Sequence, residues 1–265
     1  MSNKEVKLVE KLSGLLKQLN QREYLHHFGP KKYKFLHHVL ALLMKESLKC
    51  SFRRISLSLN QLGIKVPTYS AICKSRKRIP IQLWNSFLKL TSGINHKIVA
   101  VDSTGFSLSN PSYHYVKRIN RREYIKSYAK LSAFLDLKNK KFTAIKIRIK
   151  PRHDIKDVDY LLRSSSPSEK LIGDSAYDAE SLHEKCFESK IQTIIKPRKN
   201  VKKGFYRKKQ MKNYSDKEYH QRSLIESEFG ATKRKYGGYV LGKSSSSIKS
   251  ELYCKAIAHN LMLCN

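Results

Sequence analysis

The spacing of apolar residues changes near His96, and this change limits the folds open to the chain. Before it, apolar side chains recur every three or four residues, as in the segment 34–47. That spacing is typical of amphipathic helices. After it come short runs rich in β-branched residues, of which 98–101 is the first, and such runs are typical of buried strands. We therefore predict a helical domain over 1–95 and an α/β domain over 96–265.

The strands expected in the second domain occur in an informative order. Three come first, over 98–101, 124–135 and 142–149, and helices then alternate with strands at 171–174 and 191–195. This order predicts a ribonuclease H-like mixed sheet of five strands with helices on both faces. In that topology the first and fourth strands are parallel neighbours.

Acidic residues follow the two strands that this topology places side by side. Asp102 comes directly after the first strand and Asp174 ends the fourth, so we expect them at the same edge of the sheet. A later helix that carries Glu226 would cross nearby. Like charges this close favour the binding of hard divalent cations such as Mg²⁺. Each aspartate also has a structural explanation, since Asp102 could bind backbone amides and Asp174 could cap the next helix.

The helix expected around Glu226 has polar residues at regular intervals. Tyr219, Arg222, Glu226 and Lys233 are separated by three, four and seven residues, which returns to one side of a helix. A carboxylate between an arginine and a lysine suits a ligand beside bound phosphates. It equally suits a solvated stripe of ion pairs, each stabilising the helix by about 0.2–0.5 kcal/mol. Glu228 points to the opposite side.

The charge balance indicates a polyanionic partner. Lysine and arginine number 54 against 21 acidic residues, a net charge of +33. Compact folding must overcome that repulsion, and nucleic acid is the partner that neutralises it best. A membrane surface is disfavoured, because no apolar run approaches the roughly 18 residues of a spanning helix. The charge is also not confined to one amphipathic face.

Part of the helical domain resembles a helix-turn-helix. A helix over 52–62 is stopped by Gly63, and Thr68 can cap a second helix that carries Lys74 and Lys77. We expect these two lysines to contact DNA. A helical bundle with a basic surface would have a similar sequence.

The cysteines and the first residues bear on the compartment. The five cysteines are scattered without a CxxC pair, so neither a disulfide framework nor a zinc ribbon is supported. Residues 1–10 are charged where a signal peptide would be apolar. We expect a cytoplasmic, nucleoid-associated protein.

Several motifs occur together in the order seen in one family. The helix pattern fits Y-x₂-R-x₃-E-x₆-K at every spacing. The other matching stretches are 66–70, 101–105 around the first acid, 128–131, and 173–178 around the second. Over about 52–262 the chain resembles the DDE transposases of insertion sequences, in the group of families four and five that carries this signature. Ser132 stands where that group usually has a histidine.

The resemblance implies a reaction and a set of roles. Asp102, Asp174 and Glu226 would be catalytic and hold two Mg²⁺ ions, for which Mn²⁺ can substitute. The enzyme would cut DNA at the ends of its element and join the 3′-hydroxyls to target DNA. Arg222 and Lys233 would hold phosphates, and Tyr219 would contact the backbone or stack on a base. A homodimer would pair the two ends.

The resemblance also gives a role to the basic segment 196–212, which we expect to be a loop beside the acids. A solvated loop is disfavoured there because no acidic residue interrupts the segment. Its candidate DNA contacts are Lys202, Lys203, Arg207 and Lys208. Two alternatives stay open: a DNA-binding protein without catalysis, such as a decayed transposase, and a nuclease of the same fold that does not join ends.

Overall fold

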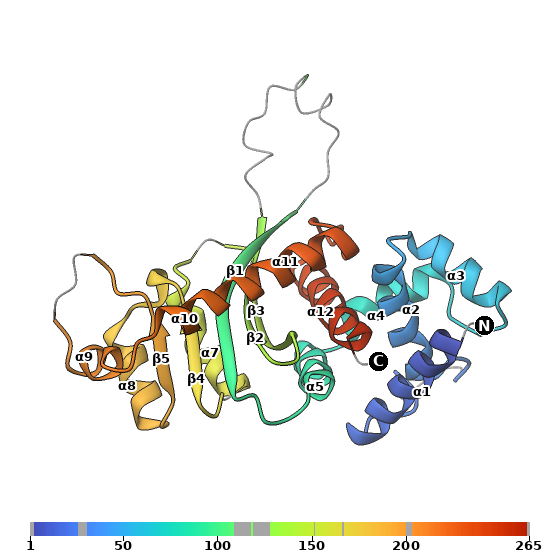
Figure 1. Ribbon diagram of the computed structural model, residues 1–265. Helices are drawn as coiled ribbons and strands as arrows, with labels where there is room; N and C mark the ends of the chain where they lie inside the picture. Colours follow the sequence, from blue (N-terminus) through green and yellow to red (C-terminus); the bar gives the residue numbers. More distant parts are fainter. Residues whose placement is uncertain are drawn as a thin grey trace.

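The computed structural model describes residues 3–25, 31–108, 118, 128–150, 152–165, 167–199 and 203–263. Its first part is helical, as predicted (Figure 1). The helices there are α1 (Asn3–Gln18), α2 (Phe35–Ser47), α3 (Phe52–Gln61), α4 (Tyr69–Arg78) and α5 (Ile81–Ser92). Among these, α2, α3 and α4 pack on one another.

The α3–α4 pair has the two helices of a helix-turn-helix but a longer connection. Residues 62–68 join them, whereas the turn of that motif usually has three or four residues. Gly63 begins the connection with φ +79°, a conformation that glycine adopts without strain. The Asn60 side chain contacts both the N–H and the C=O of Val66. Thr68 is the N-cap residue of α4, as predicted, but its side chain makes no capping hydrogen bond.

The strands form one mixed sheet, as predicted. They are β1 (Ile98–Ser107), β2 (Tyr128–Asp136), β3 (Lys141–Arg148), β4 (Lys170–Gly173) and β5 (Gln192–Ile195). Their order is β3-β2-β1-β4-β5, with β1, β2 and β3 antiparallel and with β4 parallel to both β1 and β5. The first and fourth strands are therefore neighbours. Residues 124–127, predicted to begin the second strand, lie outside the described part.

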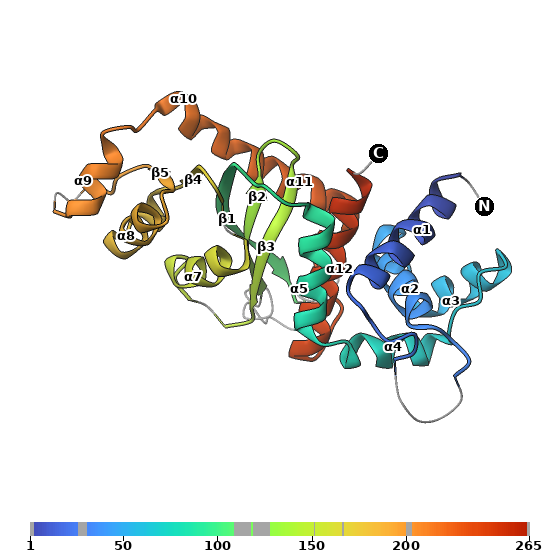
Figure 2. The same cartoon turned by 90° about the horizontal axis from the view of Figure 1, so that it is seen from below.

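Helices cover both faces of the sheet, because apolar side chains alternate along its strands. Val99 and Val101 pack with α7 (Ile155–Ser164) and α8 (Glu180–Glu188). Ala100, between them, faces the other cluster, to which α5 and the C-terminal helices contribute. Helix α5 lies along α12 and β3 (Figure 2), so it covers the sheet even though it belongs to the helical first part of the chain.

The C-terminal part differs from expectation in two places. Its elements are α9 (Phe205–Met211), α10 (Asp216–Tyr219), the 3₁₀ turn η3 (His220–Arg222), α11 (Ser223–Tyr236) and α12 (Ser245–Met262). The segment 196–212 was predicted to be a loop but contains α9. The single helix expected through Glu226 is interrupted by η3, so Arg222 precedes α11 instead of lying within it.

Candidate active site

Asp102, on β1, and Asp174, directly after β4, lie at the same edge of these neighbouring strands. The pairing of β1 with β4 runs from Ile98↔Lys170 to Ala100↔Ile172, and the same register continued by two residues sets Asp102 beside Asp174. The expectation that Asp102 ends its strand was wrong, because β1 continues to Ser107 through its pairing with β2. It is β4 that stops there, and this leaves the β1 edge open at Asp102.

A backbone amide orients each of the two carboxylates. Asp102 Oδ1 accepts from Ser103 N at 2.8 Å. Asp174 Oδ1 accepts from Ala176 N at 2.9 Å and so caps the 3₁₀ turn η2 (Ser175–Tyr177). Both structural explanations raised by the sequence are therefore realised. Each of these hydrogen bonds occupies only one oxygen of its carboxylate.

Arg222 connects Glu226 to this pair. Its Nη1 lies 2.6 Å from Glu226 Oε1 and 3.7 Å from Asp102 Oδ2. Burial raises the pKa of the Asp102 carboxyl, the Ser103 amide and Arg222 oppose that rise, and Asp174 and Glu226 add to it. The three acids are thus electrostatic neighbours, although they come from three distant stretches of the chain.

The donor set suits a hard cation, but the three acids do not form a closed cluster. All the candidate ligands are carboxylate oxygens, which Mg²⁺ prefers. Beside them the Tyr177 hydroxyl is buried without a hydrogen-bond partner, and its pKa is raised by burial and then by Asp102 and Asp174. In the described ranges, no three His, Cys, Asp or Glu side chains are close enough to hold a metal ion. Glu226, now paired with Arg222, would have to turn toward the aspartates.

Of the ion pairs that the sequence suggested along this helix, the described residues form the one between Arg222 and Glu226. Lys233 has no carboxylate at ion-pair distance in the part of the chain that the structure describes. Its Nζ lies 5.5 Å from the centroid of the Phe106 ring, and burial lowers its pKa. Glu228 turns toward α12, where its Oε2 is 3.5 Å from His259 Nε2. It therefore points away from the site, as predicted.

Tyr219 is the last residue of the short helix α10, which precedes Arg222 and Glu226 in the chain. Its ring centroid lies 6.0 Å from that of Tyr214, and its side chain is partly exposed. On α4, Lys74 and Lys77 are both exposed. Their surroundings are compatible with contacts to a nucleic acid.

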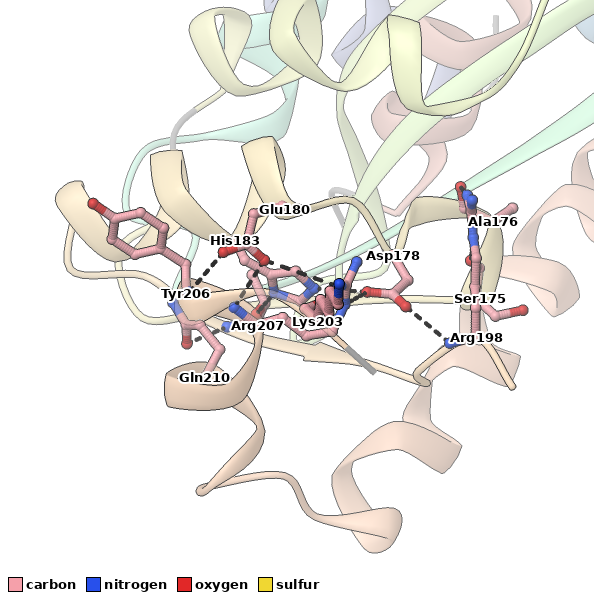
Figure 3. A network of polar contacts seen from close by, with 11 residues as sticks. Ser175, Ala176, Asp178, Glu180, His183, Arg198, Lys203, Tyr206, Arg207 and Gln210 are labelled. Carbon is pink, nitrogen blue, oxygen red and sulfur yellow. Dashed lines mark hydrogen bonds and ion pairs between the residues drawn. The ribbon is translucent and has the colours of Figure 1, made fainter. Parts of the chain in front are cut away.

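The expectation that Arg207 contacts DNA was wrong. Its side chain is buried, and its Nε donates to Asp178 Oδ1 at 2.6 Å (Figure 3). Asp178 also accepts from Arg198 N at 2.8 Å and lies 3.0 Å from His183 Nε2. Burial would raise the pKa of Asp178, but these three partners lower it below its usual value. The N-cap residue of α8 is Ala179, the residue after Asp178.

The same network ties the basic segment to the region of Asp174. The Arg198 guanidinium donates to the carbonyl oxygens of Ser175 and Ala176, each at 2.9 Å. Neither this role nor that of Asp178 was foreseen. Asp178 belongs to the motif 173–178, but its partner Arg207 lies 29 residues further along the chain. Of the remaining candidates, Lys203 and Lys208 are exposed, and Lys202 lies outside the described residues.

Comparison with known proteins identifies the class. Residues 94–261, more than half of the chain, match the family described as the transposase DDE domain. The chain belongs to this family. No curated protein matches it.

Two solved structures are similar. One is the piggyBac transposase synaptic complex with hairpin DNA, with a TM-score of 0.51, 10% identity, and coverage of 97% of this chain and 72% of that chain. It supports the ribonuclease H-like fold. The other is a simian T-cell lymphotropic virus intasome in complex with a PP2A regulatory subunit. Its TM-score is 0.32 and its sequence identity 9%, and the match covers 82% of this chain and 65% of that chain. That score is too low to bear on the fold. Within the described residues, no helix combines the length and apolar character needed to span a bilayer.

Proposed function

We propose that this chain is an insertion-sequence transposase of the Y-x₂-R-x₃-E-x₆-K group, which cuts DNA at the ends of its element and joins the 3′-hydroxyls to target DNA. The observation that carries the proposal is the placement of Asp102 beside Asp174 in a chain of the transposase DDE family. Glu226 is linked to the pair through Arg222. This arrangement puts three acids within one electrostatic neighbourhood.

The proposed site holds two Mg²⁺ ions, or Mn²⁺ in their place, through Asp102, Asp174 and Glu226. Bound divalent ions supply Lewis acidity, which activates water and stabilises the leaving oxygen. The amides of Ser103 and Ala176 keep the two aspartates in fixed orientations. No protein nucleophile takes part.

Arg222 has a second part in this proposal. Without metal it neutralises Asp102 and Glu226, which keeps the acids close despite their repulsion. If cations bound to the acids supplied that neutralisation, the Arg222 guanidinium would be free to hold a phosphate. Lys233 would hold a second phosphate, because no acid competes for it among the described residues, and Tyr219 would contact the DNA backbone or a base.

The proposed partner is double-stranded DNA, both element ends and target, held by a homodimer in the cytoplasm. The net charge of +33 supports a polyanionic partner. Exposed lysines on α4 and near α9 would grip the duplex: Lys74, Lys77, Lys203 and Lys208, with Lys202 beyond the described residues. The proposed division is a DNA-binding part over 1–95 and a catalytic part over 96–265.

The proposal is tested by cleavage of a labelled duplex that carries the DNA flanking the gene. The full chain should nick it in Mg²⁺ or Mn²⁺ and leave it intact when EDTA removes the metal. Binding without cleavage in either metal would indicate a decayed transposase. Cleavage that continues in EDTA would rule out the metal site.

A further inference from the structure

A basic cavity lies at the start of α12, away from the three acids. It has a volume of about 660 Å³, is open to solvent on one side, and is lined by the end of α2, the α2–α3 connection, α4 and the loop that leads into α12. Both views place α4 beside α12 (Figures 1 and 2). Within the described residues, no acidic side chain lines it. The basic side chains that do are Lys45, Lys49, Arg76, Lys77 and Lys243.

Arg76 is the arginine of this lining, and it is almost completely buried. Its side chain is 8% exposed, and Nη1 lies 3.1 Å from Glu251 Oε2. Its Nε is buried and has no hydrogen-bond partner. An unsatisfied donor on a buried cation is unfavourable. The Arg76 guanidinium lies over the Phe52 ring, 5.0 Å from its centroid, so a ligand oxygen would reach Nε only after the side chain turned toward the cavity.

The carboxylates behind the cavity are already engaged. Glu46 accepts from Lys45 at 2.7 Å. Glu251 binds Arg76 and also accepts from two backbone amides of the loop before α12, each at 3.0 Å. The rim lysines Lys77 and Lys243 are exposed and have no ion pair among the described residues. The lining therefore has an excess of positive charge.

Two helices begin at this cavity. Ser51 caps α3 and Ser244 caps α12, and both serines line the space. The first amides of a helix and its dipole favour an anion at its N-terminus. Gly242 lets the loop pass close to α12, since a Cβ there would lie 2.8 Å from Ile248 N. The two helix termini and the rim lysines Lys77 and Lys243 border one space, and the Arg76 side chain belongs to its lining.

We propose that this cavity binds a backbone phosphate of duplex DNA, an assignment that rests on the proposed function. A phosphate supplies several acceptor oxygens to the cations and amides that converge here. DNA is the source that fits, because Lys77 belongs both to the cavity and to the exposed face of α4, where Lys74 also lies. The contact would fix α4 and α12 on the same duplex.

The test is the salt dependence of duplex binding by the full chain. Lys243→Ala should lower the slope of log K against log salt by about 0.9, the loss of one phosphate contact. Lys243→Arg should retain the slope, because it keeps the charge. The matched control is Lys138→Ala, in the β2–β3 turn at the far end of α12, where His259 Nε2 lies 3.2 Å from Lys140 O. The slope measured for Lys138→Ala should equal that of the unmodified protein.

The outcomes separate this site from the proposed function. If Lys243→Ala and Lys138→Ala have equal slopes, the cavity takes no DNA phosphate, although transposase activity stands. If the unmodified chain binds no duplex, the proposed function itself is contradicted, and with it the assignment of the cavity. A second arm adds inorganic phosphate at constant ionic strength. If it raises the melting temperature of the unmodified chain but not of Lys243→Ala, while their DNA slopes agree, the occupant is a free phosphate and the DNA assignment is overturned.

Discussion

Asp102→Asn, Asp174→Asn and Glu226→Gln should each lower the rate of DNA cleavage by roughly three orders of magnitude, because losing a metal ligand removes about 4 kcal/mol of transition-state stabilisation. DNA affinity should hardly change, since the basic surfaces are untouched. The fold should also survive. An asparagine oxygen can still accept from the amides of Ser103 and Ala176, and each change removes a charge from an acidic neighbourhood.

Cleavage rate, DNA affinity and melting temperature should be measured on the same preparations. Glu228→Gln is the matched control, because it makes the same chemical change two residues from Glu226 while facing His259. It should cleave at nearly the normal rate. A variant of any of the three acids that keeps more than about a tenth of the activity would remove that residue from the proposed ligand set.

Asp178→Ala should lower the free energy of unfolding by about 3–5 kcal/mol, the effect expected when one partner of a buried ion pair is removed. It would leave the Arg207 guanidinium buried without its carboxylate and would free the Arg198 amide. Helix α9 would lose its buried ion pair to the segment that precedes α8 and would keep the hydrogen bonds from Tyr206 N and Arg207 N to Glu180. Urea denaturation of the full chain measures the change.

Asp159→Ala is the control for that experiment. Asp159 pairs with Lys185 at 2.8 Å, but both side chains are about half exposed, and such surface pairs stabilise a protein by about 0–1 kcal/mol. Equal effects of the two substitutions would mean that the Asp178 network does not hold α9 in place.

The features that local pattern determines were predictable from the sequence. The change of apolar spacing at His96 placed the first strand, and the order of strands placed β1 beside β4. Because parallel neighbours end at one edge, the sequence alone predicts that Asp102 and Asp174 lie close together. The pairing depends only on the alternation of side chains along strands and on connection rules that many folds obey.

The features that depend on distant partners were not predictable. Strand β1 continues past Asp102 because β2 pairs with it as far as Ser107↔Tyr128. Arg207 looked like an exposed basic residue, yet it is buried because Asp178 lies close in space and not in sequence. The position of Arg222 between two acids likewise follows from the path of η3, which interrupts the predicted helix.

The most direct measurement for the proposed function is a strand-transfer assay with a duplex that carries the DNA flanking the gene, a supercoiled target and Mg²⁺. The expected product is target DNA covalently joined to the 3′-hydroxyl of the cut end, formed by the unmodified chain and absent with Asp174→Asn. Cut ends that accumulate without joining would identify a nuclease of the same fold. Joined product formed equally well by Asp174→Asn would contradict the assignment of the site.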